Sequence, residues 1–243
     1  MNTWIPWARF LVTAVVGALL GTLPVGLQAQ EGPDPGMSFF ITSAGPGQGA
    51  ELGGLEGADA HCQMLAEAAG AGDHHWHAYL SAEATTDAAA VNARDRIGSG
   101  PWTNFAGVQV ASDVDNLHGD DNNLTKETIL TEKGAMVNGR GDSPNMHDIL
   151  TGSQLDGTVF SDDENHTCDN WTSSGEGSAQ VGHHDRQGGG ANPTSWNSAH
   201  GSRGCSQSDL QGTGGNGYYY CFASGASDAG PEAQPFRSEF RLP

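Results

Sequence analysis

The sequence predicts an α+β domain with two helices, short strands and long loops rich in Gly and Asp. Two segments carry apolar residues at helical spacing, and short runs of aromatic and β-branched residues elsewhere are typical of strands. Gly supplies 36 of the 243 residues, and hydrophobic residues make up 36% of the chain. This composition favours a loop-rich fold with enough apolar side chains to form a core.

The N-terminal residues 1–29 have the features of a secretory signal peptide. Arg9 is their only charged residue, and an apolar run over residues 10–20 is followed by Pro24. The alternative is an uncleaved membrane anchor, but Pro24 and Gly26 end the apolar run short of the roughly 20 residues that a span requires. We therefore expect a protein that is secreted, or located in the periplasm or cell envelope, and not inserted in the membrane after signal cleavage.

The folded domain is predicted to span residues 37–224, after a polar linker at 30–36 and before a Pro-containing tail at 225–243. Residues 38–42 (SFFIT) are typical of a strand because they combine aromatic and β-branched side chains. A helix is predicted over residues 55–70, where apolar positions repeat every three or four residues and a glycine ends the pattern.

The rest of the domain is predicted to contain less regular structure. Residues 76–81 (WHAYLS) alternate large and small side chains like a strand, and residues 86–97 are expected to form a second, short helix with a Thr cap. Turns, loops and short strands are expected over residues 98–217. The last predicted strand is the aromatic run at 218–223 (YYYCFA).

Two disulfides are predicted from the cysteine count. All four cysteines follow the expected signal peptide, and an even number in an exported chain indicates disulfide bonds rather than free thiols. They are Cys62, Cys168, Cys205 and Cys221. The residues by themselves leave all three pairings open.

The charge balance excludes one class of partner. The chain has 10 Lys and Arg against 29 Asp and Glu, which gives a formal net charge of -19. A surface of that sign repels nucleic acid phosphates and anionic membranes. We therefore expect no nucleic acid partner.

The motifs GADAHCQ, TCDNW and YYYCFA, each with one cysteine, occur in the order strand and helix, long loop region, final strand. This order resembles the C-type lectin-like fold, and in particular its endostatin-like branch. Residues 116–153 and 195–207 also resemble bacterial secreted lectin-like proteins of unassigned role. The resemblance implies short antiparallel strands and nested disulfides, which join Cys62 to Cys221 and Cys168 to Cys205.

The resemblance also implies a place for a carbohydrate ligand. Sugar-binding members of the fold hold calcium partly through a Trp-Asn-Asp strand, and this chain has Trp196, Asn197 and Ser198 in that order, without the Asp. Trp196, Asn197 and the nearby His200 are therefore candidate ligand-binding residues. Exposed indoles, with Trp102 and Trp171 as further candidates, can stack on a sugar ring.

Two other groups of residues are candidate metal ligands. The first crowds carboxylates and an amide into ten residues, which suits calcium, although a solvated acidic loop is the alternative. It comprises Asp113, Asp115, Asp120, Asp121 and Asn122. The second combines imidazoles with a carboxylate, which suits zinc or another transition metal, although loop residues that cap backbone groups are the alternative. It comprises His183, His184 and Asp185.

The expected function is that of a secreted, non-enzymatic, lectin-like module that recognises a glycan or a protein at the cell surface or in the matrix. Calcium is the one candidate cofactor, and the alternative is that the module holds none. The chain contains no H-E-x-x-H, G-x-S-x-G or Gly-Lys-Ser/Thr motif. One alternative is a metal-dependent hydrolase built on His183, His184 and Asp185, and the other is a purely structural exported domain.

Overall fold

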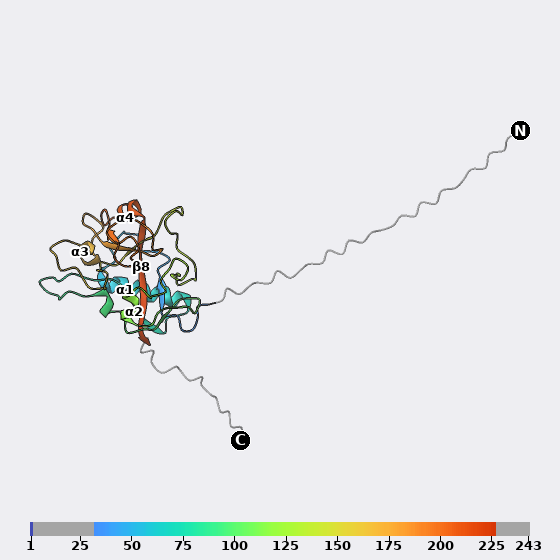
Figure 1. Cartoon of the computed structure of the whole chain (residues 1–243), viewed down its shortest axis with the longest axis horizontal. Coiled ribbons are helices and arrows are strands. Elements are labelled where there is room, and N and C mark those ends of the chain that lie inside the picture. The colour runs from blue at the N-terminus through green and yellow to red at the C-terminus, as the bar shows by residue number, and fades with distance from the viewer. Residues whose placement is uncertain (2–31, 227–243) are drawn as a thin grey trace, which may run out of the picture. The chain divides into compact units, whose positions relative to one another are not determined.

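The computed structural model describes Met1 and residues 32–226, and Figure 1 shows them in colour. Residues 2–29 of the expected signal peptide and residues 227–243 of the expected tail lie outside the described residues. A compact unit begins at Gly32. Asp34 already belongs to it, because its backbone N–H donates to the carbonyl of Phe105 at 2.9 Å. No helix in residues 32–226 is long and apolar enough to cross a membrane.

Six strands form the main sheet of this mixed α/β fold, in the order β1-β8-β5-β6-β7, with β2 also paired to β8. They are β1 (Phe39–Ile41), β2 (His74–Ala78), β5 (Asp148–Leu150), β6 (Gln180–His183), β7 (His200–Gly201) and β8 (Gly215–Ala226). The pairing of β5 with β8 is parallel, and the other pairings in the main sheet are antiparallel. The second sheet contains β3 (Trp102–Thr103) and β4 (Gln109–Ala111).

The long β8 strand organises the sheet. It spans 12 residues and pairs with β1, β2 and β5 along its length. Its aromatic side chains point alternately to the two faces, so that Tyr219 joins one core cluster and Tyr220 and Phe222 join the other. The strands predicted at 38–42, 76–81 and 218–223 correspond to β1, β2 and β8.

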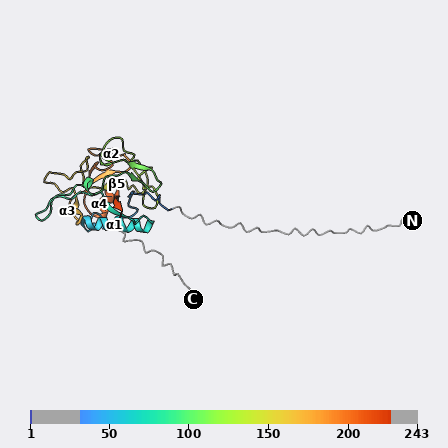
Figure 2. The same ribbon diagram turned by 90° about the horizontal axis from the view of Figure 1, so that it is seen from below.

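Residues 32–226 contain four α-helices, whereas the sequence predicts two. They are α1 (Gly54–Ala69), α2 (Val114–His118), α3 (Cys168–Trp171) and α4 (Gln207–Thr213). The first confirms the helix predicted at 55–70, and Gly70 ends it in the left-handed conformation. In Figure 2, α1 runs along the lower side of the domain and α2 lies at the upper side.

The helix predicted at 86–97 is wrong. Only η1 (Ala93–Asp95), a short 3-10 helix, forms there. The Thr85 hydroxyl accepts hydrogen bonds from the N–H groups of Asp87 and Ala88, which closes a turn. Ala82 and Val91 then pair as an antiparallel bridge. The backbone groups that a helix would use are therefore taken by a turn and a bridge.

Two disulfides link the elements, in the pairing that the family resemblance implies. Cys62 of α1 is bonded to Cys221 of β8, and Cys168 of α3 is bonded to Cys205, which lies just before α4. All four cysteines are fully buried. The first bond closes a sequence separation of 159 residues and the second a separation of 37. Both bonds fit an oxidising compartment.

A partly buried ionic network attaches α1 to the sheet. The Asp59 carboxylate on α1 accepts hydrogen bonds from the Ala78 N–H at 2.8 Å and from the Arg96 guanidinium at 2.6 Å, and it lies 3.1 Å from His77 Nδ1. Burial raises the pKa of Asp59. The contacts to His77, Arg96 and Ala78 outweigh burial, so that the pKa lies below its ordinary value of 3.8.

Replacing Asp59 by Asn is expected to lower the free energy of unfolding at pH 7 by about 2 kcal/mol, the size of hydrogen bonds to a charged group. The folded-state pKa of Asp59 is depressed, so its contribution is present above the unfolded-state pKa and is lost as the pH falls through the folded-state value. The difference between wild type and D59N in urea unfolding should therefore shrink at acidic pH. The exposed Asp163→Asn is the control, and a D59N difference that does not change with pH would contradict the prediction.

Candidate metal centre

Strand register brings three potential metal ligands to one end of the main sheet. Asp148, the first residue of β5, is paired directly with His183, the last residue of β6. His200, the first residue of β7, is paired with Val181, two residues before His183. Paired residues and residues two apart lie on the same face of a sheet. Asp148, His183 and His200 therefore share one face and one end.

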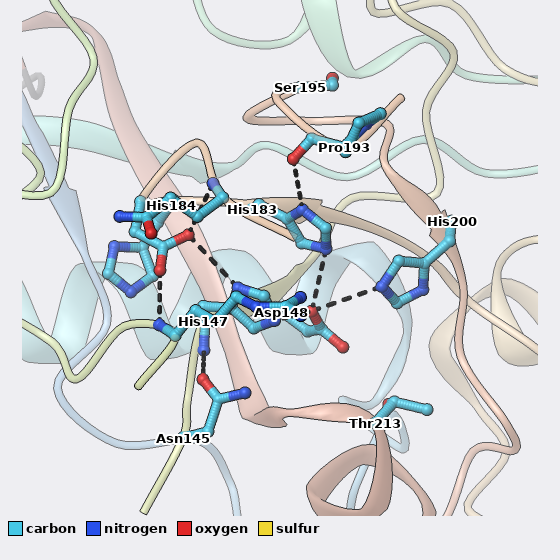
Figure 3. A network of polar contacts seen from close by, with 12 residues as sticks. Asn145, His147, Asp148, His183, His184, Pro193, Ser195, His200 and Thr213 are labelled. Carbon is cyan, nitrogen blue, oxygen red and sulfur yellow. Dashed lines mark hydrogen bonds and ion pairs between the residues drawn. The ribbon is translucent and has the colours of Figure 1, made fainter. Parts of the chain in front are cut away.

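A third imidazole joins the group from the residue before β5. His147, Asp148 and His183 form the one set of three or more His, Cys, Asp or Glu side chains in residues 32–226 whose donor atoms lie within 4.8 Å of one another. The Nε2 atoms of His147, His183 and His200 lie 3.1, 3.4 and 3.6 Å from Asp148 Oδ1. Figure 3 shows Asp148 between the imidazoles, with His200 on the side opposite His147. We call His147, Asp148, His183 and His200 the His3Asp cluster.

The other nitrogen of each imidazole faces an oxygen. His147 Nδ1 lies 3.3 Å from Asp185 Oδ1, His183 Nδ1 lies 2.8 Å from the Pro193 carbonyl, and His200 Nδ1 lies 3.0 Å from the Gly201 carbonyl. Carbonyl and ionised carboxylate oxygens only accept hydrogen bonds, so each Nδ1 carries the proton. In the neutral imidazole, Nε2 then carries a lone pair. When all three rings are neutral, three such lone pairs point at the Asp148 carboxylate.

The carboxylates in this region are held in the ionised form. Burial raises the pKa of Asp148, but its contacts with His183 and His200 outweigh burial and the pKa lies below 3.8. The pKa of Asp185 is lowered further, because contacts from His147 and from the N–H groups of Arg140 and Gln187 outweigh its burial. The pKa of His200 is raised, mainly by its contact with Asp148.

Several polar atoms of the cluster are left unsatisfied. Both Asp148 oxygens and His183 Nε2 are fully buried and have no hydrogen bond of normal geometry with the described residues. Leaving a buried charged group without a partner costs several kcal/mol. A cation beside the carboxylate would satisfy it together with the Nε2 atoms of His147 and His183. His200 Nε2 lies 3.6 Å from Asp148 Oδ1 but outside the set of donor atoms within 4.8 Å of one another, so it would have to move to become a fourth ligand. Three imidazoles and one carboxylate are a ligand set that zinc and related ions accept.

The glycine run at 188–190 packs directly on two of the imidazoles. A Cβ atom on Gly188 would lie 2.1 Å from His183 Cε1 and 2.4 Å from His183 Nδ1. A Cβ atom on Gly190 would lie 2.9 Å from the Cβ of His200. All three distances are below normal contact, so these positions accept glycine because the backbone must approach the two histidine side chains closely. The sequence predicts only a turn at this glycine run.

The group His183, His184 and Asp185 does not act as one ligand set. His183 reaches Asp148, whereas His184 Nε2 lies 3.1 Å from the Asn138 carbonyl. Asp185 contacts His147 Nδ1 rather than any Nε2 of the cluster, so it is placed to orient His147 and not to join the cluster. Burial lowers the pKa of His184. The three side chains diverge because β6 ends at His183 and a turn, in which the Arg186 N–H donates to the His183 carbonyl, contains His184 and Asp185.

The acidic residues at 113–122 do not converge on a cavity. Asp113 caps α2 by accepting the N–H of Asn116 at 2.8 Å, and Asp115 pairs with Arg94 at 3.1 Å. Asp120 and Asp121 are exposed. Asn122 uses its amide to donate to the carbonyls of Leu117 and Gly119, and its oxygen accepts from Arg186. The segment is therefore a capped helix and a turn rather than the open loop that the sequence predicts.

The candidate sugar-binding residues are largely buried. Trp196 is 3% exposed and packs on Tyr79 at 4.8 Å between ring centroids. Asn197 is 1% exposed, and its amide donates to the Tyr79 hydroxyl and to the carbonyls of Gln154 and Leu155. These two residues support the loop at 154–155 from inside. Trp102 and Trp171 are also fully buried, so neither can stack on a ligand. Of the three candidates, His200 alone joins the His3Asp cluster.

The sequence analysis missed His147 and Asp148. Their one local signal is a His-Asp pair directly before the apolar run that becomes β5. The signal is weak, because its meaning depends on which residues lie opposite β5. Asp148 and His183 are 35 positions apart, and only their pairing in the sheet identifies them as neighbours.

A pocket of about 550 Å³ opens beside the cluster, and His200 is part of its wall. It lies between the loop at 154–160 and the segment at 191–201. The residues that surround it are Gln154, Leu155, Asp156, Phe160, Gln180, Ala191, Asn192, Ser198, His200 and Gly201. The cluster therefore has a route to solvent on the His200 side.

No protein-family model matches the chain, and no curated protein is significantly similar to it in sequence. These comparisons therefore do not identify the C-type lectin-like fold that the motifs resemble. The chemistry of the His3Asp cluster has to be inferred from its geometry and its surroundings.

Replacing Gly188 by Ala is expected to displace the His183 ring and to lower the free energy of unfolding by about 2 kcal/mol, as overpacking of a buried site does. The matched control is the neighbouring Gly189→Ala, since a Cβ atom there meets nothing within 4 Å. Urea unfolding measures the stability of both variants, and the histidine resonances in NMR spectra report the ring position. Equal behaviour of G188A and G189A would contradict the close packing described above.

Proposed function

We propose that this protein is an exported binding module that holds one transition-metal ion, with zinc favoured, in the His3Asp cluster. His147, His183 and His200 would each supply Nε2, and Asp148 would supply a carboxylate oxygen. The metal would replace the unfavourable contact among four electron-rich atoms with four coordinate bonds. This proposal revises the candidate set His183, His184 and Asp185 and keeps His183 as a ligand.

The single observation that carries the proposal is the orientation of the three imidazoles. Each directs Nδ1 at an oxygen and Nε2 at Asp148. Metal-binding histidines almost always donate the second ring N–H to a carboxylate or carbonyl, which fixes the tautomer and the ring angle. All three rings satisfy this condition, and the carboxylate of Asp185 gives His147 the arrangement of a carboxylate–histidine–metal triad.

The donor set favours a transition metal over calcium. Calcium takes six to eight oxygen ligands, whereas this cluster offers three nitrogens and the oxygens of one carboxylate. Zinc commonly takes four nitrogen, sulfur or oxygen donors in tetrahedral geometry. Copper(II) and nickel(II) also bind imidazole, so the experiment below includes them.

For the fold, we propose a C-type lectin-like topology of the endostatin-like branch. The order of β1, α1 with Cys62, β2, α3 with Cys168, and β8 with Cys221 supports it, as do the nested disulfides. The disulfides and the acidic charge also support an extracellular or envelope location. A glycan or an extracellular protein stays the expected partner class.

We propose a binding role rather than a catalytic one. All four donors of the cluster would be occupied by the ion. The pocket wall contains one further ionisable group, the Asp156 carboxyl, which accepts hydrogen bonds from the hydroxyl and N–H of Thr158. These bonds lower the pKa of Asp156 and make it a weak proton acceptor.

The purified protein, stripped with chelator and dialysed against zinc, is expected to retain one zinc ion per chain by elemental analysis. Free zinc at about 100 times Kd should raise the free energy of unfolding by about 2.7 kcal/mol. His183→Gln should weaken zinc binding by at least about 100-fold, because removing even a residue that orients a ligand costs about 10- to 100-fold. Asp185→Asn should weaken zinc binding by about 10- to 100-fold.

The matched control for His183→Gln is the adjacent His184→Gln. Its ring contacts the Asn138 carbonyl rather than Asp148, so zinc affinity should be close to that of wild type even where stability falls. Failure of the wild-type protein to retain zinc, copper(II) or nickel(II) would contradict the proposal. Equal losses of zinc affinity in H183Q and H184Q would contradict the assigned ligand set.

A further inference from the structure

The His3Asp cluster is closed to solvent except on one side. The side chains of His147, Asp148 and His183 are 4%, 2% and 0% exposed, whereas that of His200 is 25% exposed. His200 is also the cluster member that forms part of the pocket wall. A molecule in this pocket would therefore approach the cluster past His200.

The pocket wall offers apolar surface more than free polar groups. Leu155 is 52% exposed, and Phe160 is held by stacking on His166 at 3.8 Å between ring centroids. The side-chain amides in the wall already have hydrogen-bond partners. Gln154 donates to the Thr158 hydroxyl and the Val159 carbonyl, and Gln180 donates to the Ser198 hydroxyl. A ligand would gain apolar contact from Leu155 and Phe160 and few new hydrogen bonds from these amides.

The charge of the pocket selects against anions. No Lys or Arg is among its wall residues, and apart from His200 its one ionisable side chain is the carboxyl of Asp156. The whole chain carries a formal charge of -19. A carboxylate or phosphate ligand would enter against this charge and, apart from His200 and the bound ion itself, would find no cationic group beside the pocket. A neutral ligand with an electron pair for the metal meets no such barrier.

We propose that the pocket beside His200 admits a small neutral ligand that joins a nitrogen donor to an apolar ring. The inference rests on the metal proposed above: the nitrogen would coordinate the ion as an additional ligand, and the ring would pack on Leu155 and Phe160. Ions that bind imidazole accept further nitrogen donors, and zinc sites can expand from four to five ligands. The protein would then be a metal-dependent receptor for such ligands.

The test uses cobalt(II) as a coloured substitute for zinc and 4-phenylimidazole as the probe. Adding 4-phenylimidazole to the cobalt-loaded full chain should change the visible absorption of cobalt in a saturable way. Imidazole has the nitrogen without the phenyl ring, and benzoate has the ring with an anionic donor. Both should bind at least about 10-fold more weakly than 4-phenylimidazole, a difference of about 1.4 kcal/mol.

Leu155→Ala distinguishes ligand contacts in the pocket wall from coordination to the metal. Leu155 is exposed, so the variant should fold and keep its cobalt spectrum. Its affinity for 4-phenylimidazole should fall about 5-fold or more, whereas its affinity for imidazole should change little. The matched control is Met64→Ala on α1, whose side chain is equally exposed at 52% and lies outside the pocket wall. It should bind 4-phenylimidazole like the wild type.

The outcomes distinguish the two proposals. No cobalt spectrum and no metal retention would overturn the metal site itself. A normal cobalt spectrum that 4-phenylimidazole leaves unchanged would overturn the inference and leave the metal site standing. Equal affinity for benzoate and 4-phenylimidazole, or an unchanged affinity in L155A, would also overturn the inference, because the pocket would then not select the ligand in the way described.

Discussion

The buried carboxylate of Asp148 is the constraint on which the site depends. Its side chain is 2% exposed, and neither oxygen has a hydrogen bond of normal geometry with the described residues. An ionised carboxylate in such a position costs several kcal/mol unless a positive charge lies beside it. The alternative to a metal is extra protons on the imidazoles. One bound divalent ion would neutralise the carboxylate and use every Nε2 lone pair as well.

The surroundings of the cluster hold the donors in place before any ion arrives. Three oxygens fix the rings through Nδ1, and the Gly188 and Gly190 backbone lies against two of the rings. Asp185 has a double role, because it contacts His147 and also accepts the Arg140 N–H at 2.5 Å. The ring angle of His147 is thereby tied to the position of the loop that carries Arg140. A site with preset rings loses little side-chain entropy on binding an ion.

The local sequence pattern was sufficient to predict some helices and strands, but it was insufficient to predict the candidate site. The apolar repeat identifies α1, the run YYYCFA identifies β8, and the disulfide pairing that the family resemblance implies is the one observed. The helix predicted at 86–97 does not form, because the Thr85 hydroxyl closes a turn where a helix cap was expected. The arrangement of the candidate site could not be predicted for a different reason: its side chains come from different strands, and the register that brings them together is a non-local property.

The predicted trio of adjacent residues illustrates this limit. His183, His184 and Asp185 look like one ligand set in the sequence, yet the turn that follows β6 sends His183 toward Asp148 and His184 toward the Asn138 carbonyl. Asp185 contacts His147, the residue before β5. The pattern of histidines and carboxylates thus led to the segment that contains His183. To identify which side chain would bind an ion and which would orient that side chain, one has to know the pairing of β5 with β6.

The disulfides and the sheet bear on how metal binding relates to folding. In small zinc domains the ion supplies the folding free energy, and the apo chain is unfolded. Here Cys62–Cys221 fixes α1 to β8, and β8 pairs with β5, which begins at Asp148. Two core clusters lie on the faces of this sheet and do not depend on the His3Asp cluster. The apo protein should therefore already be folded, so that the free energy of metal binding is available for affinity and for selecting a ligand beside His200.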